Sequence, residues 1–197
     1  MVMKVQRYRK ELRQFCVVPN AFNEEEVDKI VDLEDLQKFT KGQVGSGPDG
    51  KVNKKTRDSD IMWLMPDQNS GWLFEKFAMF VSQVNTDHFM YDIDGFDSFQ
   101  YTRYKKKEHY DWHYDMDMSS SDFMRKISAT VMLTEPKEYE GGEFEVVSNG
   151  RVDAPELIKP NRGDIIFFAS WMPHRVRPVT SGVRKSLVCW VMGKRTW

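Results

Sequence analysis

The chain has 197 residues, of which 40% are hydrophobic, 30% charged and 13% aromatic. This length and composition fit one folded domain with a substantial core, and they exclude a disordered chain. With 29 Lys and Arg against 30 Asp and Glu, the net charge of −1 gives no overall reason to expect nucleic acid or membrane binding. The segment 151–197 carries nine basic residues against three acidic ones, which suits either a solvated face or an anionic ligand.

Cysteine content and hydropathy indicate the compartment. Cys16 and Cys189 are too few for a disulfide framework and lie in apolar runs, so we expect two buried thiols. No apolar run approaches the roughly 20 residues that a membrane span requires. The basic N-terminus lacks the apolar stretch of a secretory signal. We therefore expect a cytoplasmic protein with no membrane partner.

Two helices are predicted in the first half of the chain. Asn23 and Glu26 form the pattern of a capping box at the start of a helix from about Glu24 to Leu36. A second helix, from about Gly71 to Asn85, carries an apolar stripe and would be capped by one residue of the pair 69–70. We expect both helices to support one face of a sheet.

The segment between these helices, Thr40 to Arg57, is rich in glycine, at positions 42, 45, 47 and 50. It also contains the turn pair Asp49-Gly50, which indicates a loop or hairpin tip. We interpret it as a mobile lid rather than a structural element.

From about residue 96 the apolar period changes from 3.6 to 2. Short β-rich runs separated by turn signals follow, at residues 96–104, 109–114, 126–134, 143–147, 164–169, 174–176 and 184–192. Such a series favours a β-sandwich or jelly roll. We predict an α+β fold in a single domain, residues 1–197. In it, residues 1–95 give helical support and the lid, and residues 96–197 form a double-stranded β-helix (jelly-roll) core.

Metal-ligating residues are concentrated in the run His109-Tyr-Asp111-Trp-His113-Tyr-Asp115. It contains two His-x-Asp triplets, and alternate residues of a strand point the same way, so each His and its Asp could face one cation. His109 and His113 are separated by roughly 13 Å in an extended strand, so both cannot bind one ion. The pattern alone leaves open which triplet is the ligand pair.

A third ligand has to come from elsewhere, and His174 is the candidate, 59 residues after Asp115. Two imidazoles and one carboxylate leave open coordination positions, as in non-haem Fe(II) oxygenases. Arg184 follows His174 by ten residues, and Ser186 shares its face of the strand. An Arg fork with a neighbouring hydroxyl can hold the distal end of a dicarboxylic cosubstrate.

With these residues in order, the sequence resembles the prolyl 4-hydroxylase-like branch of the 2-oxoglutarate/Fe(II)-dependent dioxygenases. The matching blocks are Gln100-Tyr-x-x-Tyr104, Tyr110-x-x-His113-x-Asp115, Gly141-Gly-Glu143, Lys159-Pro-x-x-Gly-Asp164, Phe168-x-Ser170 and His174-x-Val-x-Pro-Val179-x-x-Gly-x-Arg184-x-Ser186. The family places a cosubstrate-binding tyrosine nine or ten residues before the metal His. Tyr104 stands nine before His113, which selects His113 and Asp115 over His109 and Asp111.

The resemblance implies a site and a reaction. His113, Asp115 and His174 would bind Fe(II). Arg184, Tyr104, Ser186 and Thr130 would hold 2-oxoglutarate, and Arg57, Trp63 and Tyr110 would face the primary substrate. The implied reaction is hydroxylation of an unactivated C–H bond with O2, releasing succinate and CO2, with ascorbate as reductant. Peptidyl proline is the favoured substrate, and a small molecule is the alternative.

Three alternatives stay open. A nucleic-acid demethylase of the same superfamily would carry a second Arg six residues after Arg184, where this chain has Trp190, so we do not expect a nucleic-acid partner. A non-redox metal-binding jelly roll would leave the spacing between His174 and Arg184 unexplained. His109 and Asp111, finally, could support the metal site without binding the ion.

Overall fold

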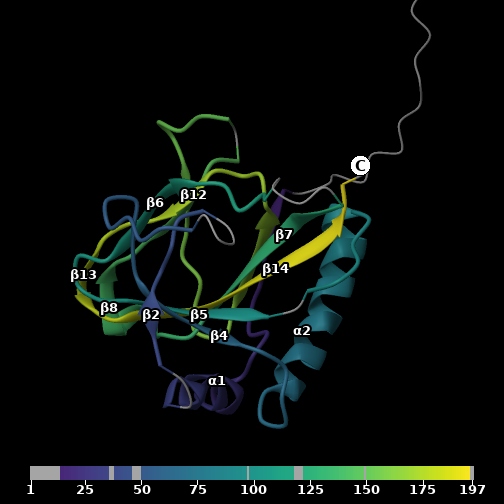
Figure 1. Cartoon of the computed structure of the whole chain (residues 1–197), viewed down its shortest axis with the longest axis horizontal. Helices are drawn as coiled ribbons and strands as arrows, with labels where there is room; N and C mark the ends of the chain where they lie inside the picture. The colour runs from purple at the N-terminus through teal and green to yellow at the C-terminus, as the bar shows by residue number, and fades with distance from the viewer. Residues whose placement is uncertain are drawn as a thin grey trace, which may run out of the picture.

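The chain folds into two antiparallel sheets with helices packed on the outside of the larger one (Figure 1). This computed structural model describes residues 14–35, 38–45, 50–96, 98–117, 122–148 and 150–195. The larger sheet has seven strands in the order β1 (Phe15–Val18), β11 (Ile165–Ala169), β7 (Phe123–Met132), β14 (Arg184–Lys194), β5 (Phe99–Tyr104), β4 (Asp60–Leu64) and β2 (Thr40–Lys41).

The smaller sheet supplies the opposite wall of the site. Its five strands run in the order β10 (Glu156–Ile158), β9 (Phe144–Val146), β12 (His174–Val176), β6 (His109–His113) and β3 (Arg57–Asp58). A separate pair is formed by β13 (Val179–Gly182) and β8 (Tyr139–Gly141). The seven predicted strand runs all contain strands, and His174–Val176 has the predicted bounds. The short strands β1, β2, β3, β4, β8, β10 and β13 were not predicted.

The capping box at the first helix is confirmed. The Asn23 side chain accepts a hydrogen bond from the backbone of Glu26, whose carboxylate accepts from the backbone of Asn23. Helix α1 (Glu24–Asp32) then tightens into a single 3₁₀ turn, η1 (Leu33–Asp35), so the α-helix is shorter than predicted. Leu36, the predicted end, lies outside the described residues.

The second helix, α2 (Gly71–Val84), has nearly the predicted bounds, and one π-helical turn, η3 (Asn85–Phe89), extends it. Ser70 occupies the N-cap position, but its side chain does not cap the helix. Instead the Ser70 hydroxyl donates to the carbonyl of Met65, and the carboxylate of Asp67 accepts from the backbone N–H of Ser70. An Asx turn built on Asp67 therefore replaces the predicted side-chain cap.

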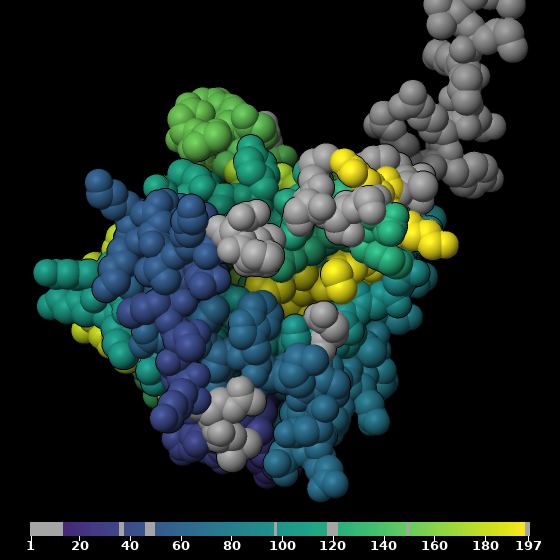
Figure 2. Space-filling model, in the orientation of Figure 1, coloured from purple at the N-terminus to yellow at the C-terminus, as the bar shows by residue number. Residues whose placement is uncertain are grey.

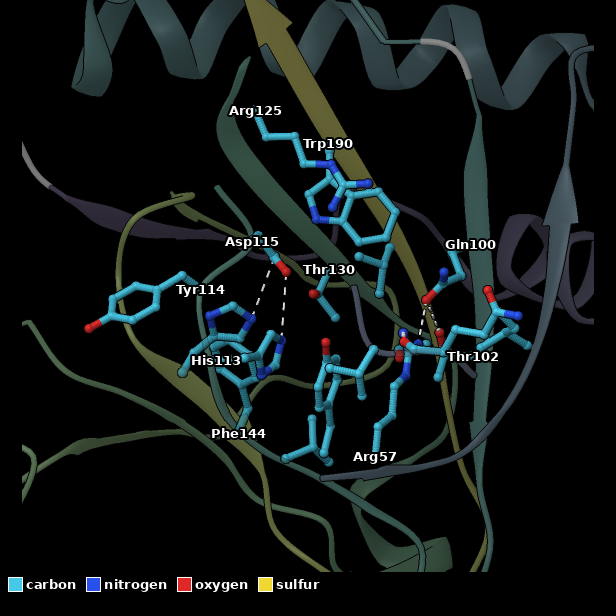
Figure 3. A pocket seen from close by; sticks show the side chains of 18 of the residues that line it. Arg57, Gln100, Thr102, His113, Tyr114, Asp115, Arg125, Thr130, Phe144 and Trp190 are labelled. Carbon is cyan, nitrogen blue, oxygen red and sulfur yellow. Dashed lines mark hydrogen bonds and ion pairs between the residues drawn. The ribbon is translucent and has the colours of Figure 1, made fainter. Parts of the chain in front are cut away.

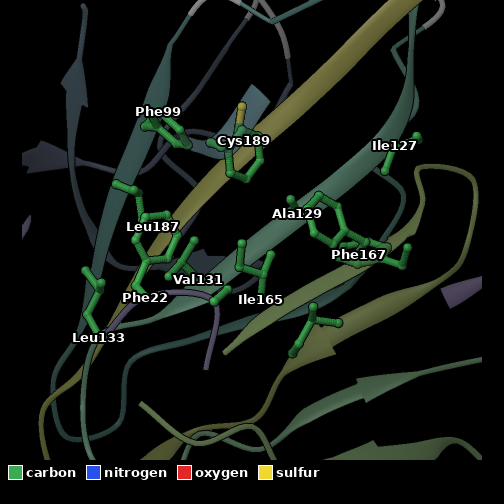
Figure 4. Packing of buried hydrophobic residues seen from close by; sticks show 14 of the residues in the cluster. Phe22, Phe99, Ile127, Ala129, Val131, Leu133, Ile165, Phe167, Leu187 and Cys189 are labelled. Carbon is green, nitrogen blue, oxygen red and sulfur yellow. The ribbon is translucent and has the colours of Figure 1, made fainter. Parts of the chain in front are cut away.

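The larger sheet has one apolar face and one polar face, because side chains alternate along each strand. The Phe77 ring of α2 lies 4.9 Å from the ring of Phe99 on β5 and 5.8 Å from that of Phe167 on β11. This face packs under α2 in a continuous core (Figure 4). The opposite face carries buried polar side chains, namely Gln100, Thr102, Ser128, Thr130, Arg184 and Ser186. That polar face is where the site forms.

The N-terminal part contributes strands as well as helices. β1 pairs with β11, β4 with β5, and β3 with β6, so both sheets are completed by residues that precede position 96. Both cysteines, Cys16 and Cys189, are buried and unbridged, as expected. Over the described ranges, no helix is both long enough and apolar enough to cross a bilayer.

The glycine-rich segment is partly a β-hairpin. Val44 and Lys51 form an antiparallel bridge with backbone hydrogen bonds in both directions, as a hairpin requires at its flanks. Residues 46–49, which include Gly47 and Asp49, lie outside the described residues. Gly42 has a packing reason: a Cβ there would lie 2.6 Å from both Arg57 Nε and Ser59 Oγ. This glycine admits the Arg57 side chain rather than providing mobility.

Candidate metal centre

A pocket of about 510 Å³ lies between the two sheets. Its walls come from the polar face of the larger sheet, from β3, β6, β9 and β12 of the smaller sheet, and from the glycine-rich hairpin. All ten residues predicted for the site line this pocket: Arg57, Trp63, Tyr104, Tyr110, His113, Asp115, Thr130, His174, Arg184 and Ser186.

Three potential metal ligands meet at one end of the pocket (Figure 3). The ligand atoms of His113, Asp115 and His174 all lie within 4.8 Å of one another. His113 ends β6 and stands directly opposite His174 on β12. Asp115 follows two residues later, where its backbone N–H donates to the Ser170 carbonyl at 3.0 Å. Its two carboxylate oxygens lie 3.6 Å from His113 Nε2 and 3.5 Å from His174 Nε2.

The hydrogen bonds of the two imidazoles define which nitrogen is free. His113 Nδ1 lies 2.7 Å from the carbonyl of Asp111, and His174 Nδ1 lies 3.0 Å from the carbonyl of Met172. Because a carbonyl only accepts, each Nδ1 carries the proton and each Nε2 keeps its lone pair. Both lone pairs point toward the carboxylate of Asp115, an arrangement that calls for a cation between them.

The pKa values of His113 and Asp115 also favour the protonation states that bind a metal ion. Burial, and then the neighbouring His174, lower the pKa of His113 to about 3, so its ring is neutral near pH 7. Burial alone would raise the pKa of Asp115, but the adjacent imidazoles of His174 and His113 outweigh it and bring that pKa below its usual range. A neutral imidazole and an ionised carboxylate are the forms that bind metal.

Aromatic rings hold the two imidazoles in place. Tyr110 stacks on His113 with ring centroids 3.5 Å apart and planes 10° apart. The ring of Phe168 meets the imidazole of His174 edge-on, with ring centroids 4.6 Å apart. The ring of Phe144 also contacts this imidazole, with ring centroids 5.6 Å apart. Locked rotamers of this kind preorganise a metal site before the ion arrives. The donor set therefore fits a divalent transition metal held by two His and one Asp.

Arg184 is a buried cation whose donors are only partly used. Its side chain is 1% exposed. One terminal nitrogen donates to Ser186 Oγ at 3.2 Å and the other to Met132 Sδ at 3.3 Å, while Nε has no partner. Within the described ranges no carboxylate pairs with this guanidinium. A hydroxyl and a thioether are weak partners for a buried charge, so the site is suited to an anionic ligand.

Tyr104, Ser186 and Thr130 surround the same region of the pocket. Tyr104 is directly opposite Arg184 in the β5–β14 ladder, and the Arg184 guanidinium lies 5.7 Å from the Tyr104 ring centre. Burial raises the pKa of Tyr104, so its hydroxyl stays protonated and can donate. Thr130 on β7 is opposite Val188, two residues past Ser186 on β14. These hydroxyls are placed to complement the Arg184 fork.

The three predicted substrate residues lie on the remaining wall. Arg57 is buried and donates to Ser59 Oγ, to the Gln43 carbonyl and to Gln100 Oε1, at 3.1, 3.2 and 2.6 Å. Its guanidinium also lies 4.6 Å from the centre of the Tyr110 ring. Trp63 is 41% exposed, which is unusual for so large an apolar side chain and places it at the mouth.

The competing triplet lies elsewhere. His109 does not line the pocket; its Nε2 and Nδ1 are 3.1 and 3.3 Å from the carbonyls of Lys55 and Lys107. Asp111 is exposed, and its carboxylate accepts from the backbone of Trp112. Through backbone contacts, His109 fastens the β5–β6 turn to the segment before β3. The structure thus brings together the triplet of His113 and not that of His109.

Sequence reasoning missed several pocket residues. Gln100 is hydrogen-bonded to Arg57, and Trp190 lies under the guanidinium of Arg125 at 4.0 Å. The indole N–H of Trp190 faces the carboxylate of Asp115 and helps to lower its pKa. Strand periodicity could have found two of them, because Gln100 shares a face with Tyr104, and Trp190 shares one with Arg184. No local signal marks Arg125, which enters the pocket from the start of β7.

Comparison with known proteins agrees with this site. The family model described as the 2OG-Fe(II) oxygenase superfamily matches residues 99–192, which contain the three candidate ligands and Arg184. A PKHD-type hydroxylase of Janthinobacterium sp. (strain Marseille) is 28% identical over 182 residues, covering 88% of this chain and 76% of that protein.

Solved structures give the same fold. A prolyl-4-hydroxylase of Pseudomonas putida superposes with a TM-score of 0.71 at 17% identity, covering 92% of this chain and 93% of its own. A Trichoplax adhaerens prolyl hydroxylase, in complex with a peptide fragment of the hypoxia inducible factor oxygen degradation domain, gives 0.74 at 20% identity, covering 91% and 83%. These similarities span both sheets rather than the core alone.

Proposed function

Because the chain belongs to the 2-oxoglutarate- and Fe(II)-dependent oxygenases, we propose that it hydroxylates a prolyl residue of a peptide or protein. The oxygenase class entails Fe(II) as cofactor, 2-oxoglutarate as cosubstrate and O2 as oxidant. The prolyl substrate is the proposed part. It is supported by the printed names of the relatives and of the structural neighbours, one of which holds a peptide.

One observation carries the proposal: a single pocket brings together three lone-pair donors and one guanidinium that no carboxylate of the described residues pairs with. We propose that His113 Nε2, His174 Nε2 and the Asp115 carboxylate hold Fe(II). When bound, the iron supplies activation of O2 coupled to decarboxylation of the cosubstrate. The protein leaves the remaining side of the ion open to the pocket.

The 2-oxoglutarate would be oriented by the far end of the same pocket. Arg184 would receive its distal carboxylate as a charge-assisted, forked pair, with Ser186 adding a hydroxyl. Tyr104 and Thr130 would line its path toward the metal. Since the Arg184 charge is already buried, the protein pays its desolvation before the ligand arrives, which favours binding of a dianion.

The primary substrate would enter past Trp63 and rest on Tyr110. Trp63 is exposed at the mouth, and its ring lies 6.0 Å from that of Trp190, giving an apolar surface suited to a prolyl ring. Burial raises the pKa of Tyr110 to about 12, so it faces the substrate as a neutral phenol. All three donating nitrogens of Arg57 are held by protein atoms, so it would act mainly by fixing Tyr110.

We also propose that the two sheets form a double-stranded β-helix and that the chain is a single domain. Support comes from the antiparallel strand orders and from the shared core, which includes residues of both halves. Ascorbate as reductant is a further part of the proposal. The alternative of a non-redox jelly roll is not retained, because the family match is to oxygenases.

The test is anaerobic titration of the protein and Fe(II) with 2-oxoglutarate, followed by addition of O2. A metal-to-ligand charge-transfer absorption should appear in the first step and succinate in the second. Incubation with proline-containing peptides and mass spectrometry should then reveal a gain of one oxygen on proline. If a small molecule stimulates succinate formation and no prolyl peptide does, the substrate is a small molecule rather than a peptide.

A further inference from the structure

Exposed lysines from two distant parts of the chain gather at one side of the pocket. We propose that this lysine rim, consisting of Lys51, Lys54, Lys55, Lys105, Lys106 and Lys107, binds an acidic segment of the polypeptide substrate. The inference rests on the proposed function, because it requires a polypeptide whose target residue enters the pocket. It assigns a charge preference to sequences flanking that residue.

Backbone contacts bring the two lysine segments together. His109 Nε2 is 3.1 Å from the carbonyl of Lys55, and His109 Nδ1 is 3.3 Å from that of Lys107. One imidazole therefore lies between the hairpin strand 51–55 and the turn 105–107. Figure 2 shows these surfaces next to each other at its left side, in blue and in teal.

The rim borders the pocket on both of its segments. Arg57, two residues after Lys55, and Tyr104, directly before Lys105, both line the pocket. β3, which continues the hairpin, pairs with β6 so that Arg57 is opposite Tyr110. A polypeptide whose target side chain lies over Tyr110 would therefore continue past the lysines on one side.

Among the described residues, most of these lysines have no carboxylate partner. In the described part of the chain, only Lys105 of the rim forms an ion pair, with Asp60 at 2.9 Å. Three neighbouring carboxylates are also bound by another cation, because Lys41 Nζ lies within 3.1 Å of Asp58, Asp60 and Glu108. The rim consequently presents net positive charge to solvent, although the whole chain has a net charge of −1.

The backbone at Lys107 gives a second, independent observation. Its φ is +73°, a left-handed conformation in which glycine is favoured and a side chain costs about 1 kcal/mol. Lysine at such a position gives the turn no conformational advantage. Its side chain is exposed, so packing does not explain the residue either. Residues in sparsely populated backbone conformations cluster at functional sites, so the strain at Lys107 is consistent with a contact to a ligand at this turn.

Charge elsewhere in the molecule is arranged in the opposite sense. Helix α1 and its 3₁₀ turn carry seven carboxylates against Lys29, and three of them pair with cations of other elements, which leaves Glu24, Glu25, Asp32 and Asp35 without such a partner among the described residues. This helix lies at the lower end of the molecule in Figure 1, whereas β6 is at the upper end. Such a separation of charge would orient an acidic partner toward the pocket and raise its association rate.

The test uses two fluorescent proline-containing peptides, identical except that glutamates flank the proline in one and glutamines in the other. Binding is measured by anisotropy on the protein loaded with Fe(II) and 2-oxoglutarate under anaerobic conditions. We expect the glutamate peptide to bind about tenfold more tightly at low salt. The preference should largely disappear when the ionic strength is raised to about 1 M. Equal binding of the two peptides would overturn the proposal.

A matched pair of triple variants localises the effect. Lys54→Glu, Lys55→Glu and Lys106→Glu together should abolish the preference for glutamate. Lys137→Glu, Lys159→Glu and Lys194→Glu produce the same change in net charge with exposed lysines outside the rim, and they should leave most of the preference in place. An equal loss in both triple variants would attribute the effect to net charge alone and overturn the rim.

The variant Lys107→Gly should affect the stability of the protein and the binding of the peptide in opposite directions. We expect a higher midpoint of thermal unfolding, because glycine relieves the left-handed backbone, together with about two- to threefold weaker binding of the glutamate peptide. Unchanged binding in this variant would contradict a role for the strained lysine.

Two further outcomes are decisive. If a single-stranded RNA of matched charge binds more tightly than the glutamate peptide, and the rim variant loses that binding, the surface is a nucleic-acid site and the proposal is wrong. Failure of the proposed function would look different: the unaltered protein would form no succinate from 2-oxoglutarate, whereas peptide anisotropy is read without turnover.

Discussion

At the scale of single residues, the site consists of polar groups whose bonding capacity the protein leaves unused. The Nε2 lone pairs of His113 and His174 face a carboxylate, and Arg184 Nε has no partner. Folded proteins rarely leave buried groups in this state. Here the two sets of unused groups have opposite needs, because the imidazoles and Asp115 require a cation whereas Arg184 requires an anion.

The first prediction concerns the ligands. His113→Ala, Asp115→Ala and His174→Ala should each abolish iron-dependent succinate formation, because each removes one of only three protein donors. His109→Ala should keep at least partial activity, since both of its nitrogens contact backbone carbonyls outside the pocket. Succinate release and anaerobic Fe(II) binding check both statements. An inactive His109→Ala beside an active His113→Ala would shift the metal site by four residues.

The second prediction concerns Arg184. Arg184→Ala should raise the KM for 2-oxoglutarate about tenfold to several hundredfold, because a charge-assisted bond is lost and a carboxylate is left unpaired. Arg184→Lys should lose less, since it keeps the charge without the fork. Fe(II) affinity without cosubstrate, measured by anaerobic titration, should barely change. A variant that loses iron but binds 2-oxoglutarate normally would give Arg184 a structural role.

Site residues could be predicted from the sequence where a fixed number of residues separates them from one another. The intervals from Tyr104 to His113 and from His174 to Arg184 are fixed along the chain, so the resemblance could identify them. Trp190 could have been found from its place on the Arg184 face of the strand, whereas Arg125 enters the pocket through strand pairing with distant segments, and nothing in its neighbourhood indicates this. Ser70 shows the reverse case: its local pattern was right for a cap, but its hydroxyl bonds Met65 instead.

At the scale of elements, the hairpin between α1 and β3 is the most lightly paired wall of the pocket among the described residues. Its strand β2 has only two residues, and its single described bridge joins Val44 and Lys51. Yet Gln43, Val44 and Gly45 line the pocket, and the carbonyl of Gln43 receives a hydrogen bond from Arg57. A lightly paired element in contact with a buried pocket residue is a suitable mobile cover.

The third prediction tests Gly42. Gly42→Ala should destabilise the protein by about 1–3 kcal/mol, because the new methyl group overlaps Arg57 and Ser59 in a packed region. Gly71→Ala is the matched control: nothing lies within 4 Å of its Cβ position, and it begins helix α2, so it should stabilise by about 0.4–1 kcal/mol. Urea unfolding measures both. Equal effects of the two variants would contradict the packing role.

The fourth prediction keeps the lid interpretation of residues 40–57. Amide hydrogen exchange in this segment should be fast in the free enzyme and should slow only when the true substrate is bound, because substrate contacts would hold the hairpin closed. The buried segment 127–131 of β7 is the internal reference, with slow exchange throughout. Strong protection of 40–57 without any ligand would show a fixed wall.

Long elements were predictable because they repeat one pattern often enough to be recognised. Helix α2 and strand β14 each present several apolar side chains at the proper period. The two-residue strands β2 and β3 contain Thr-Lys and Arg-Asp, which have no β signature, and they exist only because β4 and β6 pair with them. Tertiary pairing of this kind leaves no trace in a short polar sequence.

At the scale of the whole molecule, the two halves of the chain are interleaved. β1, β3 and β4 come from the first 95 residues and pair with β11, β6 and β5. Neither half can complete its sheets alone, and the aromatic core formed by Phe77, Phe99 and Phe167 includes residues of both.

The fifth prediction follows from this interleaving. Unfolding by urea should be one cooperative transition, with far-UV circular dichroism and tryptophan fluorescence coinciding, as expected for a single domain. Residues 96–197 expressed alone should not give a native-like spectrum, because β5 and β11 would each lose the partner on one side and become exposed edge strands. A stable, folded fragment 96–197 would divide the chain into two independent units.

The pairing of β6 with β12 places His113 directly opposite His174. In an antiparallel pair, a slip of one residue turns every side chain to the other face. A chain folded with that error would separate its imidazoles and could not gather the iron. Under the proposed function, metal binding would therefore report the correct pairing of β6 with β12, because a chain in the wrong register would lack the complete site.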